Sequence, residues 1–82
     1  GDEQKVKLRF TNHLVGAVLD RFGRDSIIIK DGDEHFTVTV NVVVSPQFFG
    51  WVFGFGKEVE IISPEEVRTE MKKQAEEICK NY

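Results

Sequence analysis

Residues 36–44 read FTVTVNVVV, and this stretch decides the fold. Every second position from Phe36 to Val44 is apolar, and Thr37, Thr39 and Asn41 occupy positions between them. Successive side chains of a strand point to opposite faces, so this pattern gives one apolar face and one largely polar face. The stretch therefore predicts a long strand that buries one face in a core.

A shorter strand is expected just before it. Residues 26–30 read SIIIK, a run rich in β-branched side chains that favours extended structure. Asp31, Gly32 and Asp33 then supply the residue types of a tight turn. The two strands are expected to form a hairpin.

The N-terminal part predicts one strand and one helix. Residues 5–10 read KVKLRF and alternate between charged and apolar side chains, as a half-buried strand does. Apolar residues recur at helical spacing over residues 13–22, which predicts a helix. Thr11 or Asn12 is its expected N-cap, and Gly23 its expected C-terminal end.

Downstream of the long strand, two more helices flank a last strand. Ser45 as N-cap and Pro46 as the first helical residue begin a helix that is expected to end at the glycines near residue 55. Residues 59–62 predict a strand. The sequence SPEE at residues 63–66 has the form of a capping box with Ser63 as N-cap. The closing helix carries an apolar stripe made of Val67, Met71, Ala75, Ile78 and Tyr82.

The predicted order β-α-β-β-α-β-α is a split β-α-β unit with one helix added. We therefore expect an α+β, ferredoxin-like sandwich: a four-stranded antiparallel sheet, both crossover helices on one face, and an extra C-terminal helix. The other face would present Lys5, Lys7 and Arg9 beside Glu58 and Glu60. Opposite charges on neighbouring strands would then attract one another.

Composition and chain start limit the classes of protein to consider. The chain has 82 residues, 30% of them charged, and a net charge of −3, so it fits one globular domain without the basic surplus of a nucleic-acid-binding chain. No apolar run is long enough to cross a membrane, and one cysteine allows no internal disulfide. The chain begins at Gly1 without a methionine. We therefore expect residues 1–4 to be a tag scar or linker remnant, and residues 5–82 to be one domain of a longer protein.

No constellation for catalysis or metal binding is evident. His13, His35 and Cys79 fall in three separate predicted elements and lack the clustered spacing of metal ligands. Nothing in the sequence supports a cysteine–histidine nucleophile pair, and Cys79 is predicted to be a half-buried structural thiol. The sequence GFGK at residues 54–57 follows a helix, so it predicts a helix end and not a dinucleotide loop. We expect no cofactor, no metal and no enzymatic activity.

The second helix is unusually aromatic. One helical face buries only about half of such a set, so either a partner or the closing helix is expected to cover the surplus. The outward positions of the two long strands carry no ring, which argues against an RNA-recognition domain. The candidate interface or packing residues are Phe48, Phe49, Trp51, Phe53 and Phe55.

The sequence resembles one known family. The run SPQFFGWVFGFG at residues 45–56, followed by VEIISP and EEV at residues 59–67, resembles the C-terminal extension, or WCX domain, of WYL-domain transcriptional regulators of the DeoR-type helix-turn-helix class. Residues 6–10, VKLRF, resemble the family's first strand with its arginine. The likeness covers nearly all of residues 5–82.

The resemblance implies a ferredoxin-like regulatory domain of a bacterial, cytoplasmic transcription regulator. It implies a part in dimerisation and effector sensing, contact with an adjacent WYL domain, and DNA binding only through an N-terminal winged helix-turn-helix outside this chain. Arg9 is implied as an effector or interdomain contact, and Trp51 with the neighbouring phenylalanines as packing residues.

Two other functions stay open on the sequence alone. The first is a free-standing ferredoxin-like module that binds a small molecule, of the amino-acid-sensing type. The second is a small enzyme of the dimeric ferredoxin-like type, which needs an acid or base with a perturbed pKa. Only His13 and His35 are available for that role, and the sequence shows no partner for either.

Overall fold

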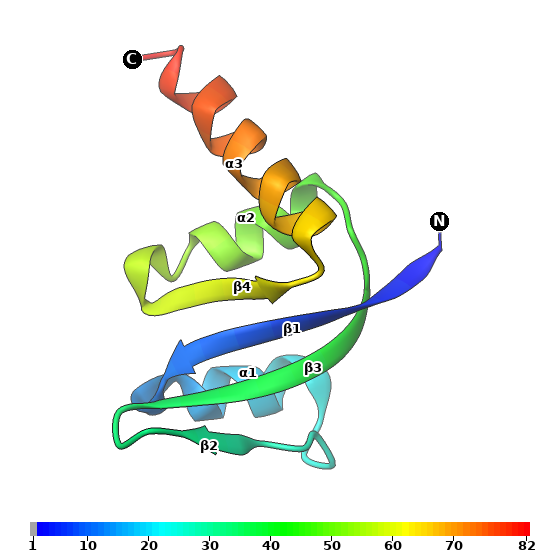
Figure 1. The fold of residues 1–82 in the computed structure, drawn as a ribbon, viewed down its shortest axis with the longest axis vertical. Helices are drawn as coiled ribbons and strands as arrows, with labels where there is room; N and C mark the ends of the chain where they lie inside the picture. Colours follow the sequence, from blue (N-terminus) through cyan, green and yellow to red (C-terminus); the bar gives the residue numbers. More distant parts are fainter. Residues whose placement is uncertain (1) are drawn as a thin grey trace.

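A computed structural model describes residues 2–82 and is drawn in Figure 1. Its elements in chain order are β1 (Glu3–Thr11), the 3-10 turn η1 (Asn12–Leu14), α1 (Val15–Phe22), β2 (Ile29–Asp31), β3 (His35–Val43), α2 (Pro46–Phe53), the 3-10 turn η2 (Gly56–Glu58), β4 (Val59–Ser63) and α3 (Glu65–Cys79). Gly1, the first residue of the predicted remnant, lies outside the described residues. Glu3 and Gln4 already belong to β1, where they pair with β3.

The four strands form one antiparallel sheet in the order β2-β3-β1-β4. The two strands with the longest alternation, β1 and β3, lie at its centre and pair over nine residues each, from Glu3 opposite Val43 to Thr11 opposite His35. β4 pairs with the second half of β1, and β2 pairs with the first three residues of β3. The order confirms the predicted central position of the two long strands.

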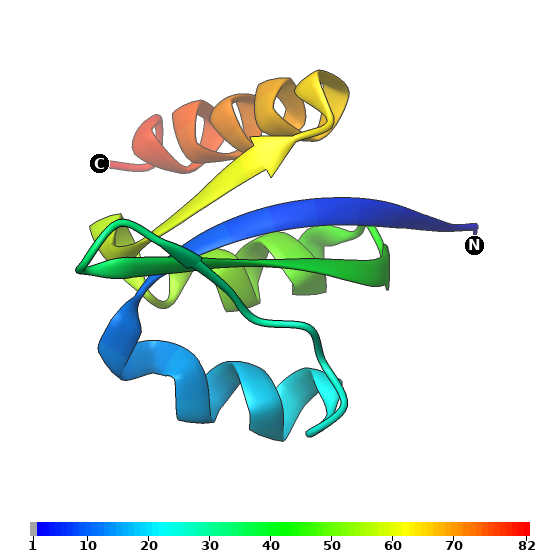
Figure 2. The same cartoon turned by 60° about the horizontal axis from the view of Figure 1, so that its bottom comes forward.

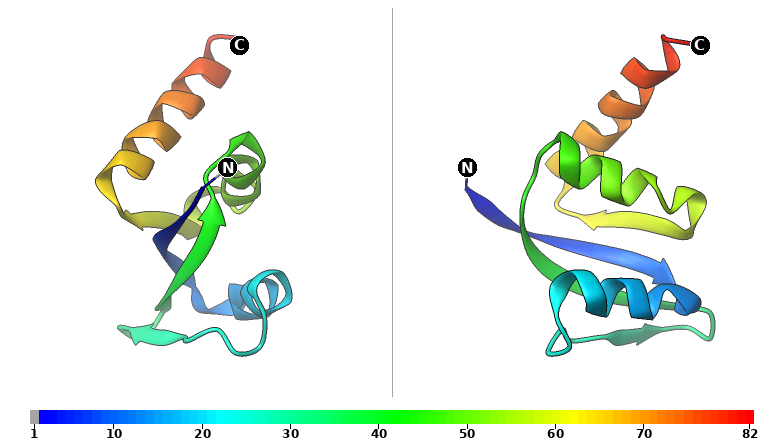
Figure 3. Two further views of the ribbon diagram at one scale, coloured as in Figure 1. Left: turned by 90° about the vertical axis from the view of Figure 1, so that its right-hand side faces the viewer. Right: turned by 180° about the vertical axis from the view of Figure 1, so that it is seen from behind.

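One face of the sheet carries α1 and α2, as predicted (Figure 3). Val6, Leu8 and Phe10 of β1 point toward these helices and are completely buried. Val18 of α1 and Val52 of α2 complete the contact from the helical side, at 0% and 2% exposure. Burial of apolar surface at this interface is the main stabilising contribution to such a fold.

The cap of α2 forms as predicted, but the capping box of α3 does not. The Phe48 backbone N–H donates to the Ser45 Oγ at 3.2 Å, and Pro46 takes the first helical position. Ser63 is instead the last residue of β4, and the residue before α3 is Pro64, with no side-chain cap. The prediction for Ser63 was wrong because the strand continues one residue further than its apolar pattern.

The first helix begins differently from the prediction. Thr11 precedes the 3-10 turn but makes no side-chain cap bond, and the Asn12 side chain donates to the Asp33 carbonyl at 2.9 Å. Asn12 therefore ties the end of β1 to the β2–β3 turn. Gly23 ends α1 with a φ of 106°, which an L side chain rarely adopts, and this confirms its predicted place.

β2 is shorter than predicted. Only Ile29–Asp31 pair with β3, so residues 26–28 of the predicted strand run outside the sheet. The tight turn itself is confirmed, since Gly32 has a φ of 72°.

α3 lies beside β4 and extends past the sheet. Figure 2 shows it on the opposite side of the sheet from α1, and Figure 1 shows its C-terminal half leading away from β4. Along its apolar stripe, Val67 is buried at 2% exposure and Met71 is partly buried, whereas Ile78 is 44% exposed and Tyr82 is fully exposed. The outer faces of β1 and β3 are left without a helix.

Candidate functional site

The outer face of the sheet carries a row of side chains that crosses all four strands. Ile29 of β2 lies opposite Thr37 of β3, Thr37 opposite Arg9 of β1, and Arg9 opposite Glu60 of β4. Thr37 is only 7% exposed, although it lies on the face without helices. Its neighbours in the row are Ile29 and Arg9, and the Arg9 side chain is partly exposed.

Arg9 is held by two side chains from the β2–β3 hairpin. Its Nε donates to the Asp31 carboxylate at 2.8 Å, and one terminal nitrogen lies 3.3 Å from His35 Nδ1. The side chains of Arg9 and Asp31 are 37% and 44% exposed. A guanidinium has five N–H donors, so the group keeps donors that could bind a carboxylate or phosphate. We call Arg9, Asp31 and His35 the arginine cluster.

The predicted charge pairing on this face was partly wrong. Glu60 does lie directly opposite Arg9, but it bonds to Arg68 of α3 at 3.0 Å. Glu58 lies in the turn before β4 and bonds to His13 at 2.7 Å. The Arg9 side chain contacts the hairpin instead, because Asp31 and His35 lie diagonally across from it on the same face.

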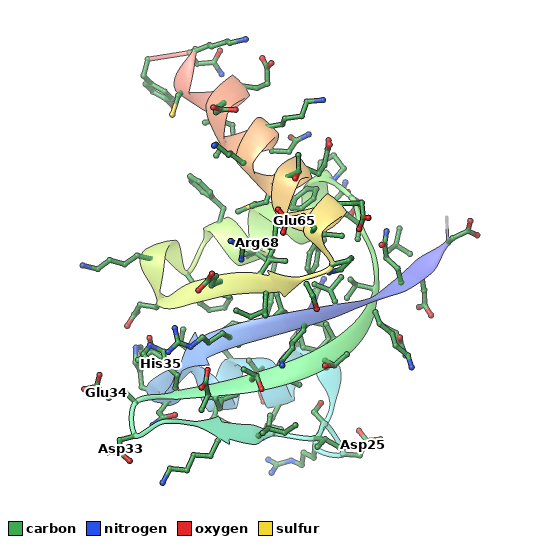
Figure 4. All side chains as sticks on the ribbon, viewed as in Figure 1. Asp25, Asp33, Glu34, His35, Glu65 and Arg68 are labelled. Atoms are coloured by element: carbon green, nitrogen blue, oxygen red, sulfur yellow. The ribbon has the colours of Figure 1, made fainter. Side chains whose placement is uncertain are left out.

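Arg68 fastens α3 to the edge of the sheet. Besides Glu60, it reaches Glu65 at 3.5 Å and donates a hydrogen bond to the backbone carbonyl of Ile61 in β4. Figure 4 shows Arg68 and Glu65 on the first turns of α3, and His35 at the far end of the sheet near the Asp33–Glu34 turn. The two polar groups, around Arg9 and around Arg68, are therefore separate.

The aromatic residues of α2 are mostly covered by the domain itself. Phe48 and Phe49 are buried at 4% and 6% exposure. The Trp51 ring packs edge-on against Phe22 of α1 at 5.3 Å between centroids, and against Phe55 at 4.9 Å. Both Trp51 and Phe55 also pack edge-on against Phe10 of β1, which stacks on Phe36.

Of the two covers expected for the surplus rings, the closing helix is not the one that packs on Trp51, and a partner stays a prediction. Trp51 and Phe55 are half-buried by α1 and β1 and not by the closing helix. Among the five aromatic candidates, Phe53 is the exposed one, at 52%. A role at an interface therefore stays a prediction, with Phe53 as the side chain most available for it.

Phe53 borders a hollow of about 680 Å³ between α2, β4 and α3. Val52, Val59, Ile61 and Met71 give it an apolar floor. Charged and polar residues line its rim, namely Glu60, Glu65, Arg68, Thr69 and Lys72. Its volume lies within the range of small-molecule sites.

Residues with potential for catalysis do not come together. His13 contacts Glu58, His35 contacts Arg9, and Cys79 is an exposed free thiol near the end of α3. The prediction of a half-buried Cys79 was wrong, because α3 has by then passed beyond the sheet. Within residues 2–82, no group of three or more histidine, cysteine or acidic side chains could hold a metal ion. The same part of the chain contains no helix long and apolar enough to cross a membrane.

The sequence alone did not identify Asp31 and His35 as partners of Arg9. The signal that could have found them is the hairpin turn, which places Asp31 opposite His35 and on the same face as Arg9. Predicting that contact requires the register in which β1 pairs with β3, and no local sequence motif specifies this register.

Comparison with protein-family models matches residues 2–79 to the WCX domain. The match includes the arginine cluster, the long central strands and the aromatic helix. A search of the curated proteins gives no match.

Proposed function

The chain belongs to the WCX domain family, the C-terminal extension domain of WYL-domain regulators, and from this premise we propose that it is the regulatory domain of a bacterial transcription regulator. In this role it takes part in effector sensing and in dimerisation, and it performs no reaction. DNA is bound by an N-terminal helix-turn-helix of the same regulator. The cytoplasm is then the expected compartment.

The observation that carries the sensing role is the arginine cluster on the helix-free face. Arg9 is oriented by the Asp31 carboxylate at 2.8 Å, and over a third of its side chain stays exposed. An oriented guanidinium with free donors suits a carboxylate or phosphate, or an acidic side chain of the adjacent WYL domain.

The fold supports the same proposal. The strand order β2-β3-β1-β4, with α1 and α2 on one face, agrees with a ferredoxin-like domain. We propose that residues 5–82 form this single domain and that a WYL domain precedes it in the regulator.

Substituting Arg9 in the regulator that carries this domain tests the proposal. Arg9→Gln removes the charge and the bidentate donors but keeps the aliphatic stem. We expect the effector-dependent change in promoter activity to be lost while DNA affinity in the absence of effector stays that of the wild type. The matched control is Lys7→Gln, two residues away on the same strand and face. A normal effector response in Arg9→Gln would contradict the sensing role.

The hollow between α2, β4 and α3 favours a second candidate function, a small-molecule-binding module that works without a WYL domain. Its apolar floor and polar rim are typical of ligand sites. Thermal-shift measurements on the 82-residue chain with a panel of amino acids and related metabolites test it. A ligand at about 100 times its Kd should stabilise the fold by about 2.7 kcal/mol. No shift with any member of the panel would count against this function.

A further inference from the structure

Most of the outer edge of β3 has no strand beside it. β2 pairs only with His35, Phe36 and Thr37, and β3 continues for six more residues to Val43. Across the described residues, no other strand and no loop hydrogen bond reaches that side of Val38–Val43. Figure 1 shows β3 running well beyond β2 and curving toward α2. The backbone groups on this side are therefore open to pair with another strand.

This edge lacks the usual protection against pairing. Proteins protect exposed strand edges with charged side chains, prolines, bulges or a covering helix. No Asp, Glu, Lys or Arg occurs from Phe36 to Gly56, in a chain whose residues are 30% charged. The opposite edge of the sheet is different, because α3 lies beside β4 and Arg68 bonds to a β4 carbonyl. The missing protection at β3 indicates that something covers this edge.

Exposed apolar side chains surround the same edge. Ile27, Ile29 and Val43 are 75%, 58% and 44% exposed. A hollow of about 530 Å³ separates Thr39–Asn41 from the loop that contains Ile27. Figure 4 places Asp25 in this loop, beside the end of the sheet. The hollow therefore borders the middle of the unpaired part of β3.

We propose that a second copy of this chain pairs its β3 edge with this one, antiparallel and about a two-fold axis. In antiparallel pairing, opposed residues lie on the same face of the sheet. With the axis at Val40, Val40 would oppose the partner's Val40 and Val42 would oppose the partner's Val38, which extends the apolar layer under the helices. In the same register Thr39 would oppose the partner's Asn41 on the outer face, so no like charges oppose each other. The pairing rests on the proposed function, since it supplies the dimer interface of that regulator.

Sedimentation equilibrium of the 82-residue chain tests the pairing. We expect a reversible monomer–dimer equilibrium, and dimerisation at least about tenfold weaker in Thr39→Lys and in Asn41→Lys, because each variant adds one charge from each copy to the interface. The matched control is Thr69→Lys, an exposed position in the hollow beside α3, which should dimerise as the wild type does. Circular dichroism melting establishes that each variant is folded.

A second measurement needs no substitution. Amide hydrogen exchange of the wild type should show protection of Val38–Val43 that rises with protein concentration, while protection of α3 does not change. A chain that remains monomeric at about 1 mM, a dimer that Thr69→Lys disrupts and the β3 variants do not, or concentration-dependent protection of α3 alone would each overturn the pairing. These measurements do not depend on the effector response of Arg9→Gln. Failure of the dimer interface and failure of the sensing role are therefore distinguishable.

Discussion

The two faces of β1 differ in burial and in charge. Toward α1 and α2 it presents Val6, Leu8 and Phe10, all of them completely buried. Toward the other side it presents Lys5 and Lys7, which are exposed and make no ion pair among the described residues, together with Arg9, whose ion pair stays partly exposed.

The comparison teaches that one strand carries its buried apolar side chains and its exposed charged side chains on opposite faces. The inner face excludes water, so a substitution there removes buried contacts and changes the free energy of unfolding. The outer face keeps its charges in contact with water, so a substitution there changes stability little and is free to change recognition. The predictions that follow measure how complete this separation is.

The largest effect is expected at the centre of the inner face. Phe10 is completely buried and contacts Phe36, Trp51 and Phe55. Phe10→Ala should lower the free energy of unfolding by about 3–5 kcal/mol, measured by urea denaturation. Lys7→Ala, on the other face of the same strand, should change it by less than about 0.5 kcal/mol. A loss below about 1 kcal/mol for Phe10→Ala would mean that this face is not the core.

The next effect concerns the aromatic helix. Trp51 is half-buried against Phe10, Phe22 and Phe55, so Trp51→Ala should cost about 2–3 kcal/mol of stability. Phe53→Ala, at a position that is 52% exposed, should cost less than about 1 kcal/mol. Thermal melting of both variants distinguishes packing from interface roles. If Trp51→Ala kept wild-type stability and only weakened assembly of the regulator, Trp51 would be an interface residue.

A smaller loss of stability is expected at Ser45 and not at Ser63, although each of these serines is followed by a proline. Ser45 accepts a hydrogen bond from the Phe48 N–H and so holds the start of α2 on the inner face. Ser45→Ala should therefore destabilise the fold by about 1 kcal/mol. Ser63 makes no cap bond, and Ser63→Ala should stay within about 0.5 kcal/mol of the wild type in the same denaturation experiment. An equal loss of stability in the two variants would indicate that Ser63 does cap α3.

The smallest effect is expected on the outer face. Asp31→Asn removes the ion pair with Arg9, whose two side chains are 37% and 44% exposed. The loss of stability should be below about 1 kcal/mol, and it should shrink further at high salt because water and ions screen the pair. Unfolding measured at low and high salt checks this. A loss above about 2 kcal/mol would show that the outer face also carries the fold.

Much of the fold could be predicted because alternation is a local signal. Residues 5–10 and 36–44 decide which side chains point inward, and the structure confirms both strands. Two failures have a common cause. Ile27 and Ile28 are β-branched but do not pair with β3, and Ser63 is the last residue of β4. Both depend on where a strand pairs, and propensity does not specify pairing.

The candidate site could be predicted only in part. The alternation placed Arg9 on the outer face, but its partners depend on the register of three strands. The basic row of β1 was expected to lie beside Glu58 and Glu60, but Arg68 from α3 binds Glu60 instead. Cys79 was expected at the edge of a buried stripe, but the packing of α3 ends before it. Contacts between distant elements decided each of these cases.

An NMR titration of the isotope-labelled chain with the WYL domain of its own regulator tests most directly whether the outer face is the one left for recognition. The account predicts that the largest amide shift changes fall in the arginine cluster, at Arg9, Asp31 and His35, on the outer face of the sheet. Shift changes confined to α1 and α2, with those three residues unaffected, would contradict it.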